Sequence, residues 1–171
     1  MANVSPQVAR FGSGKSVLRV EDDALLTGRG RFADDVSALG EAHAAFLRSP
    51  HPHARIVAID TTAAAALPGV VAVIAGADLV REGVKPLLLS ADFKRADGSP
   101  TATPPRHALA VDVVRHVGEA VAAVVATTIS AAMDAIEAID IRYEPLPMVA
   151  AAARAVAPGA PPVWAAASGN V

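Results

Sequence analysis

The pattern of apolar and polar positions is most regular over residues 117–147. Residues 120–126 are a continuous run of alanine and valine, which predicts a strand buried on both faces. Thr128 is placed to cap a helix, in which Ser130, Asp134 and Glu137 lie on the polar face. The predicted apolar face comprises Ile129, Ala132, Met133, Ile136 and Ile139. The period then changes to two, which predicts a second strand that ends at Pro145 and Pro147.

This order of elements predicts a strand-helix-strand unit whose second strand returns parallel to the first. A shorter unit is predicted upstream, with a strand over residues 54–60 buried on both faces, a short helix begun by Asp60, and a strand over residues 70–74. Further strands are expected over residues 42–48 and 107–112, with short helices over 77–83 and 148–156. The pattern therefore favours an α+β class in which helices pack on a mixed sheet.

Composition agrees with a layered core and excludes several classes. The chain has 171 residues, which suits one domain, and 53% of them are hydrophobic but only 4% aromatic. A formal net charge of -2 gives no basic footprint for nucleic acid. The absence of cysteine excludes disulfides, cysteine-ligated iron-sulfur clusters and thiol catalysis by this chain. The longest apolar runs are too short to span a bilayer, and residues 1–10 do not read as a signal peptide, so a cytoplasmic protein is expected.

The pair of His51 and His53 is the best candidate for metal binding. A His-x-His pair on a strand would present both rings to one side. The flanking Pro50 and Pro52 make this segment a rigid connection, and the sequence shows no third ligand. The default interpretation is that the histidines fix the loop through hydrogen bonds.

Two other motifs favour structural interpretations. Residues 12–16 look like part of a phosphate loop, but Ala9 occupies the position of its first glycine. We expect a flexible arm there. Asp34 and Asp35 could hold a metal or act as acid and base, but no other acidic or histidine motif lies near them, so a turn with solvated carboxylates is preferred. No nucleophile with an adjacent base and no complete metal-binding set is found.

The long segment 86–106 contains glycine, several prolines and mixed charges, and it is predicted to be a surface loop. Its apolar residues are candidates for an exposed interaction patch. These residues are Leu87, Leu88, Leu89 and Phe93.

Five stretches in the same order resemble one known family, the amino-terminal α/β-hammerhead domain of the molybdenum hydroxylases. They are Thr27 to Phe32 with Asp34-Asp35, Phe46 to His51 with His53 to Ile56, Leu67 to Val73, Gly118 to Ala122 with Tyr143 to Pro147, and Pro158 to Pro161. The family includes xanthine dehydrogenases, aldehyde oxidases and carbon monoxide dehydrogenase large subunits. His51, His53, Gly118 and Glu119 are candidate motif residues on this basis. The resemblance also implies that the apolar patch of the 86–106 loop is covered in the parent subunit, as an interface or as part of a substrate channel.

The resemblance implies an α/β-hammerhead over residues 14–157, preceded by an arm at 1–13 and followed by a linker at 158–171 toward a molybdopterin-binding region. It also implies hydroxylation of an aldehyde, an N-heterocycle or a similar small molecule with oxygen from water. The molybdenum-pterin and the catalytic glutamate would lie in later domains, and electrons would leave through iron-sulfur clusters to FAD on other subunits or domains. This chain itself is expected to bind no metal or cofactor and to be inactive alone.

Two alternatives remain at this point. The chain could be an excised domain or a naturally split subunit of such an enzyme. It could instead be a stand-alone binding module of hammerhead fold that uses the 86–106 loop, or a small enzyme with an unfamiliar site. The reading frame beyond Val171 distinguishes a fragment from a module.

Overall fold

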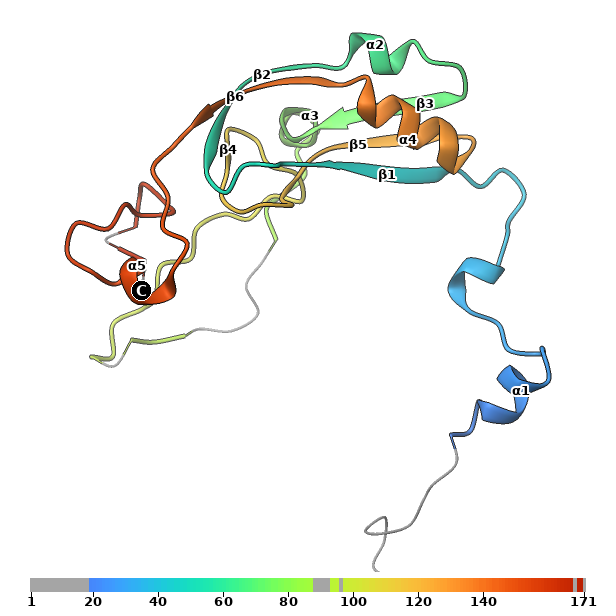
Figure 1. Ribbon diagram of the computed structural model, residues 1–171, viewed down its shortest axis with the longest axis horizontal. Coiled ribbons are helices and arrows are strands. Elements are labelled where there is room, and N and C mark those ends of the chain that lie inside the picture. The colour runs from blue at the N-terminus through green and yellow to red at the C-terminus, as the bar shows by residue number, and fades with distance from the viewer. Residues whose placement is uncertain (1–18, 88–92, 96, 168, 171) are drawn as a thin grey trace, which may run out of the picture. The chain divides into compact units, whose positions relative to one another are not determined.

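The structure is a computed structural model that describes residues 19–87, 93–95, 97–167 and 169–170 (Figure 1). It contains two compact units, residues 1–41 and residues 42–171. No helix in the described part of the chain has the length and hydropathy needed to cross a membrane.

The described part of the first unit has two short helices, α1 (Asp22–Leu26) and the 3-10 helix η1 (Ala33–Asp35). Arg29 pairs with Asp23 at 2.6 Å across the turn that ends α1. The Asp35 carboxylate accepts a hydrogen bond from the backbone N–H of Phe32 at 2.8 Å and so closes η1. This geometry confirms that the paired aspartates form a turn.

The second unit is built on two antiparallel three-stranded sheets. Sheet A has the order β1 (His43–Arg48), β5 (Ala120–Ala126), β3 (Val70–Ala75). Sheet B has the order β4 (Val113–Val114), β2 (Ala54–Asp60), β6 (Asp140–Pro145).

Strand β5 is the central strand of sheet A, between β1 and β3. Its small side chains leave room for other elements to pack closely against it. Most of its side chains are buried, as the unbroken apolar run predicted. Helix α4 (Ile129–Glu137) packs on β1 and β5, and the Thr128 hydroxyl caps it by accepting from the Ala131 N–H at 3.1 Å (Figure 1). Ala132 and Ala135, both fully buried, let the helix approach the sheet closely.

Three short helices complete the unit: α2 (Thr62–Ala65), α3 (Gly76–Arg81) and α5 (Ala152–Ala155). Helix α2 contacts α4 and β3, and its Ala64 is fully buried. At the start of α3 only glycine fits position 76, since a Cβ there would lie 2.2 Å from the Ala110 carbonyl oxygen. The predicted α+β class is therefore confirmed, with helices packed on small sheets.

The predicted pairing of the strands is wrong. Strands β5 and β6 flank α4 as expected, but β6 does not return parallel to β5 in the same sheet. It pairs with β2 in sheet B, antiparallel, with a bulge at Val57. The mixed sheet is thus replaced by two antiparallel sheets, and each neighbour of β5 comes from an earlier part of the chain.

Three local predictions also need correction. Strand β2 is buried on one face only, since Arg55, Val57 and Ala58 are exposed. The predicted apolar face of α4 is rotated, because Ile129 and Met133 are about half exposed while the alanines take the buried positions. The strand expected over residues 107–112 is instead β4, and the segment before it is an irregular connection.

Candidate functional site

Two of the predicted motif residues, Gly118 and Glu119, lie at one end of sheet A, where the turn before β5 contacts the loop after β1. Ser49 is 2% exposed, and its backbone N–H donates to the Glu119 carbonyl at 2.9 Å. Its carbonyl accepts from the Gly118 N–H at 2.8 Å. The Arg48 guanidinium donates to the Gly118 carbonyl at 2.9 Å. We call these four residues, Arg48, Ser49, Gly118 and Glu119, the Ser49–Gly118 junction.

Gly118 is required at the junction by its backbone conformation. Residues 116–119 form a turn closed by a bond from the Glu119 N–H to the His116 carbonyl at 3.3 Å. Gly118 stands third in this turn with a φ of 86°, a left-handed value that a type II turn needs and that other residues rarely adopt. A Cβ added there would meet no atom within 4 Å, so conformation rather than space selects glycine.

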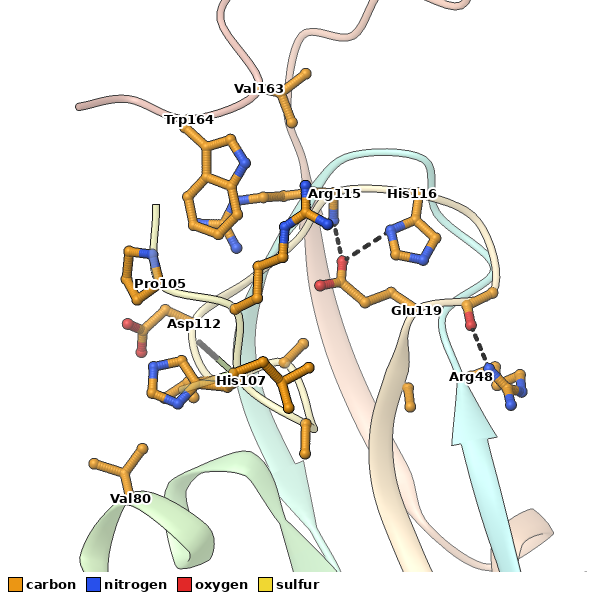
Figure 2. Close-up of a pocket in the computed structure, with 17 residues that line it drawn as sticks. Arg48, Val80, Pro105, His107, Asp112, Arg115, His116, Glu119, Val163 and Trp164 are labelled. Carbon is orange, nitrogen blue, oxygen red and sulfur yellow. Dashed lines mark hydrogen bonds and ion pairs between the residues drawn. The ribbon is translucent and has the colours of Figure 1, made fainter. Parts of the chain in front are cut away.

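The Glu119 side chain stabilises the turn through its carboxylate. Its carboxylate accepts a hydrogen bond from the backbone N–H of Arg115. The same carboxylate oxygen lies 3.7 Å from Nδ1 of His116, which forms an ion pair when the imidazole is protonated (Figure 2). The Glu119 carboxylate therefore interacts with groups of its own loop.

The Arg115 side chain extends from this turn and stacks on Trp164. Its guanidinium carbon lies 3.5 Å from the centroid of the indole ring, and one terminal nitrogen donates to the Val113 carbonyl at 2.8 Å (Figure 2). Its Nε atom is shielded from solvent and makes no hydrogen bond within the described residues. Burial lowers the pKa of Arg115, while the charges of Glu119 and Asp112 act in the opposite direction.

The two histidines of the predicted pair take separate positions. His53 Nδ1 lies 2.7 Å from the Pro147 carbonyl, and because a carbonyl only accepts, this nitrogen carries the proton. The His51 ring packs against Tyr143 with 4.9 Å between centroids. The backbone N–H of His51 donates to the Ser49 hydroxyl at 3.0 Å. Hydrogen bonds thus fix this loop, and among the described residues no group of three or more His, Cys, Asp and Glu side chains could hold a metal.

Tyr143, which is half-buried, adds a phenol hydroxyl to the same region. Burial raises the pKa of Tyr143, and a hydrogen bond with Ser49 acts in the opposite direction. The phenol is therefore neutral at physiological pH and serves as a hydrogen-bonding and packing group.

A cavity of about 700 Å³ lies beside the junction (Figure 2). Arg48, Arg106 and Arg115 contribute positive charge to its wall, and Asp112 and Glu119 contribute negative charge. Its apolar lining includes Val80, Leu87, Val163 and Trp164. The cavity has the size and mixed polarity of a small-molecule site, but it shows no nucleophile beside a free base.

The predicted interface loop is only partly within the described residues. Leu87 and Phe93 are 65% and 69% exposed, and Leu88 and Leu89 lie outside the described residues. The segment is less irregular than predicted, because Leu87 forms a β-bridge with Arg106, and Lys94 forms one with Pro100. Leu87 also lines the cavity.

Sequence reasoning missed Arg115 and treated Trp164 as part of a segment that leaves the domain. A signal was available, because Trp164 is the only tryptophan and a large aromatic ring rarely lacks a packing partner. The cation that covers it could not be identified, since Arg115 and Trp164 are far apart in sequence.

Comparison with known proteins places this geometry in a family. The sequence profile of the family described as "Aldehyde oxidase and xanthine dehydrogenase, a/b hammerhead domain" matches residues 27–147. The nicotine 6-hydroxylase large subunit of Paenarthrobacter nicotinovorans is 43% identical over 145 residues, which are 85% of this chain and 17% of that protein. The carbon monoxide dehydrogenase large chain of Afipia carboxidovorans is 42% identical over 151 residues, 88% of this chain and 17% of its relative.

Comparison with solved structures finds the same kind of protein. Quinoline 2-oxidoreductase from Pseudomonas putida 86 superposes with a TM-score of 0.81 at 42% identity, over 92% of this chain and 19% of that chain. The Cu,Mo-CO dehydrogenase gives a TM-score of 0.69 at 38% identity, over 86% of this chain and 17% of that chain. The chain thus spans less than a fifth of the proteins that it matches. It belongs to the aldehyde oxidase and xanthine dehydrogenase a/b hammerhead domain family.

Proposed function

We propose that this chain is the hammerhead domain of the large subunit of a cytoplasmic molybdenum hydroxylase, with a structural and interface role. The observation that carries the proposal is the family match over residues 27–147, combined with coverage of only 17% of each of the two relatives above. A domain of this size that recurs inside much longer oxidoreductase subunits supports a part in the same kind of assembly.

The proposed reaction is hydroxylation of an aldehyde, an N-heterocycle or a similar small molecule with oxygen from water. The names of the relatives support this range, since they include a nicotine 6-hydroxylase and a quinoline 2-oxidoreductase. Specificity among such substrates is assigned to the rest of the large subunit.

The residues of this chain do not fit the cofactors of such an enzyme. The sequence has no cysteine for an iron-sulfur cluster, and the described residues contain no cluster of His, Cys, Asp and Glu that could ligate a metal. Glu119, which lines the cavity, is bound to its own loop. We therefore assign the molybdenum-pterin to the molybdopterin-binding domains of the same subunit, and the iron-sulfur clusters and FAD to other subunits or domains.

The names of other relatives support such partners. One is a "xanthine dehydrogenase molybdenum-binding subunit" of Escherichia coli, and another is subunit gamma of a dehydrogenase complex. Both names describe parts of assemblies. On this proposal the isolated 171-residue chain is inactive.

One observation favours a second candidate, a stand-alone binding module. The cavity of about 700 Å³ beside Arg115 and Trp164 is large enough for a small organic ligand. Because Trp164 is the only tryptophan, its fluorescence reports directly on this cavity.

The test is to purify the native protein that carries this domain, with whatever subunits accompany it. The proposal predicts bound molybdenum and flavin, bleaching of the flavin absorbance by an N-heterocycle or an aldehyde, and incorporation of 18O from labelled water into the product. A native protein limited to this chain, whose Trp164 fluorescence responds to small molecules in the wild type but not after Arg115→Leu, would favour the binding module instead.

A further inference from the structure

Sheet A has a second face, opposite α4, on which two successive rows of side chains are entirely apolar. The residues of β1, β5 and β3 lie in register across it. Side chains alternate along a strand, so the positions adjacent to those that pack on α4 point to this second face. One row across the sheet is Ala44, Val125 and Ala72, and the next is Phe46, Ala123 and Ile74. We call these six residues the open face of sheet A.

The open face is incompletely covered. Phe46 is 49% exposed, Ala44 is exposed, and Val125, Ala72 and Ile74 are half-buried. Ala123 is 9% exposed and lies between Phe46 and Ile74 in the same row. Within the described residues, none of the six belongs to the buried clusters that form the core.

The opposite face of the same three strands is covered by α4 and serves as a comparison. Its rows are Ala45, Val124 and Val73, then Leu47, Ala122 and Ala75. All but Ala75 belong to the core cluster or pack against it, and Ala75 is 9% exposed. Helix α4 lies along sheet A and contacts β1, β5 and β3 (Figure 1). Both faces of sheet A are therefore apolar, although α4 covers one.

Sheet B shows that an uncovered face in this protein is normally polar. Its outer side carries Arg55 and Glu144, paired at 3.2 Å, together with Arg142, Asp60 and Asp140. An antiparallel sheet with one solvated face alternates in this way, whereas a sheet buried on both faces does not. The composition of sheet A is thus that of a sheet covered on both sides.

We infer that the open face of sheet A is an interaction surface that is covered by an apolar surface from the remainder of the large subunit polypeptide. This inference rests on the proposed function. The relatives named above are much longer than this chain, which spans 17% to 19% of them, so the covering surface would be supplied by the same polypeptide. A tethered partner binds at a high effective concentration and needs little contact area.

A second copy of the chain is a poorer occupant. A stable interface between separate proteins buries about 800 Å² on each partner, contributed by roughly 20–30 residues. The open face has six residues, of which three are alanine. It is too small for a stable dimer but sufficient as a contact between domains of one chain.

The test compares two substitutions in two contexts. Phe46→Glu places a charge on the open face, and Val57→Glu places one at a strand position of similar exposure, 44%, in sheet B. In the 171-residue chain both variants should unfold at the same denaturant concentration as the wild type. In the complete large subunit, Phe46→Glu should lower the melting temperature and speed release of the domain by protease, whereas Val57→Glu should change neither.

Hydroxyl-radical labelling supplies a readout independent of folding. Phe46 should be oxidised readily in the 171-residue chain and lose most of that labelling in the large subunit. Equal labelling in both contexts would overturn the inference, even if the large subunit contains molybdenum and the proposed function holds. Absence of molybdenum and of any longer polypeptide would remove the proposed function and the inferred occupant together.

Two further outcomes would also overturn the inferred occupant. A concentration-dependent dimer of the 171-residue chain that Phe46→Glu abolishes would show that a second copy covers the face. A rise in Phe46 labelling after deletion of residues 1–41 would show that the amino-terminal unit of this chain covers it.

Discussion

Gly118 links the motif that resembles the family to a physical requirement. Its φ of 86° allows the turn that brings its own N–H to the Ser49 carbonyl and its carbonyl to Arg48. Gly118→Ala should destabilise the protein by about 1–2 kcal/mol, the cost of a left-handed conformation for a residue with a Cβ. Denaturant unfolding measures this loss.

Gly169→Ala is the matched control, since Gly169 has no positive φ and no atom within 4 Å of an added Cβ. It should leave the free energy of unfolding nearly unchanged. Equal effects of the two substitutions would contradict the role assigned to the turn.

Asp78 makes the stability of the protein depend on pH. Its carboxylate accepts from the Ala75 N–H at 2.8 Å and pairs with Arg81 at 2.7 Å, and the Ala75 bond is the main cause that lowers the pKa of Asp78 below 3.8. Because the folded state favours the charged carboxylate, this stabilisation is present above pH 3.8 and is lost as the pH falls through the lower folded-state pKa.

Asp78→Asn should therefore cost about 1 kcal/mol at pH 7, as loss of a helix cap does. The difference from the wild type should shrink in acid unfolding measured below pH 3.8. Asp134→Asn, on the exposed side of α4, serves as control and should unfold like the wild type throughout. A penalty for Asp78→Asn that does not change with pH would exclude the proposed charge effect.

At the scale of elements, the orientation of α4 is open to direct measurement. Ile136 packs against the main core cluster, whereas Met133 is 51% exposed although helical spacing placed both on one face. Ile136→Ala should cost about 2 kcal/mol, the lower end for a large aliphatic residue, since it is only partly buried. Met133→Ala should change the free energy of unfolding by less than about 0.5 kcal/mol. Similar losses in urea melts would show that the helix is rotated toward the face predicted from sequence.

The same helix shows how far periodicity can be used. The periodicity of the sequence correctly predicted the existence of β5, α4 and β6, the Thr128 cap and the burial of the alanine-valine strand. The prediction of the buried face was right for Ala132 and Ile136 but wrong for Ile129 and Met133. Alanine is weakly hydrophobic yet allows the closest approach, and this packing gain depends on the partner surface. Pattern alone cannot measure that gain.

The prediction of strand pairing failed for a related reason. A strand-helix-strand order is compatible with a parallel return, but β6 gains antiparallel partners in β2 while β5 is satisfied by β1 and β3. These partners are far away in sequence, and local residues do not encode the choice. The Ser49–Gly118 junction was partly predictable from its motif residues, whereas the Arg115–Trp164 contact depends on the fold.

At the scale of the whole molecule, the 86–106 loop is expected to be a site of early proteolysis. Lys94 is exposed next to Phe93, which is 69% exposed, and the described parts of the loop form isolated β-bridges rather than a strand ladder. Trypsin should cut the 171-residue chain first after Lys94, Arg95 or Arg106, and mass spectrometry identifies the bonds. Arg55 and Arg142, which lie within sheet B, should resist.

The proposed function adds a second expectation for this loop. In the complete large subunit the same bonds should be protected, because Leu87, Phe93 and their neighbours would face other domains. Early cleavage of the loop in the large subunit would contradict that docking. Resistance in the isolated monomer would show that the loop packs on its own domain.

We propose that this chain is a non-catalytic domain within a molybdenum hydroxylase large subunit. The most direct test is the mass and metal content of the native polypeptide that contains the sequence, measured beside the 171-residue chain prepared without a histidine tag. We expect a polypeptide several times longer that carries stoichiometric molybdenum, and no stoichiometric metal on the 171-residue chain. A native polypeptide no longer than this chain, or stoichiometric molybdenum or zinc bound to the chain alone, would contradict this proposal.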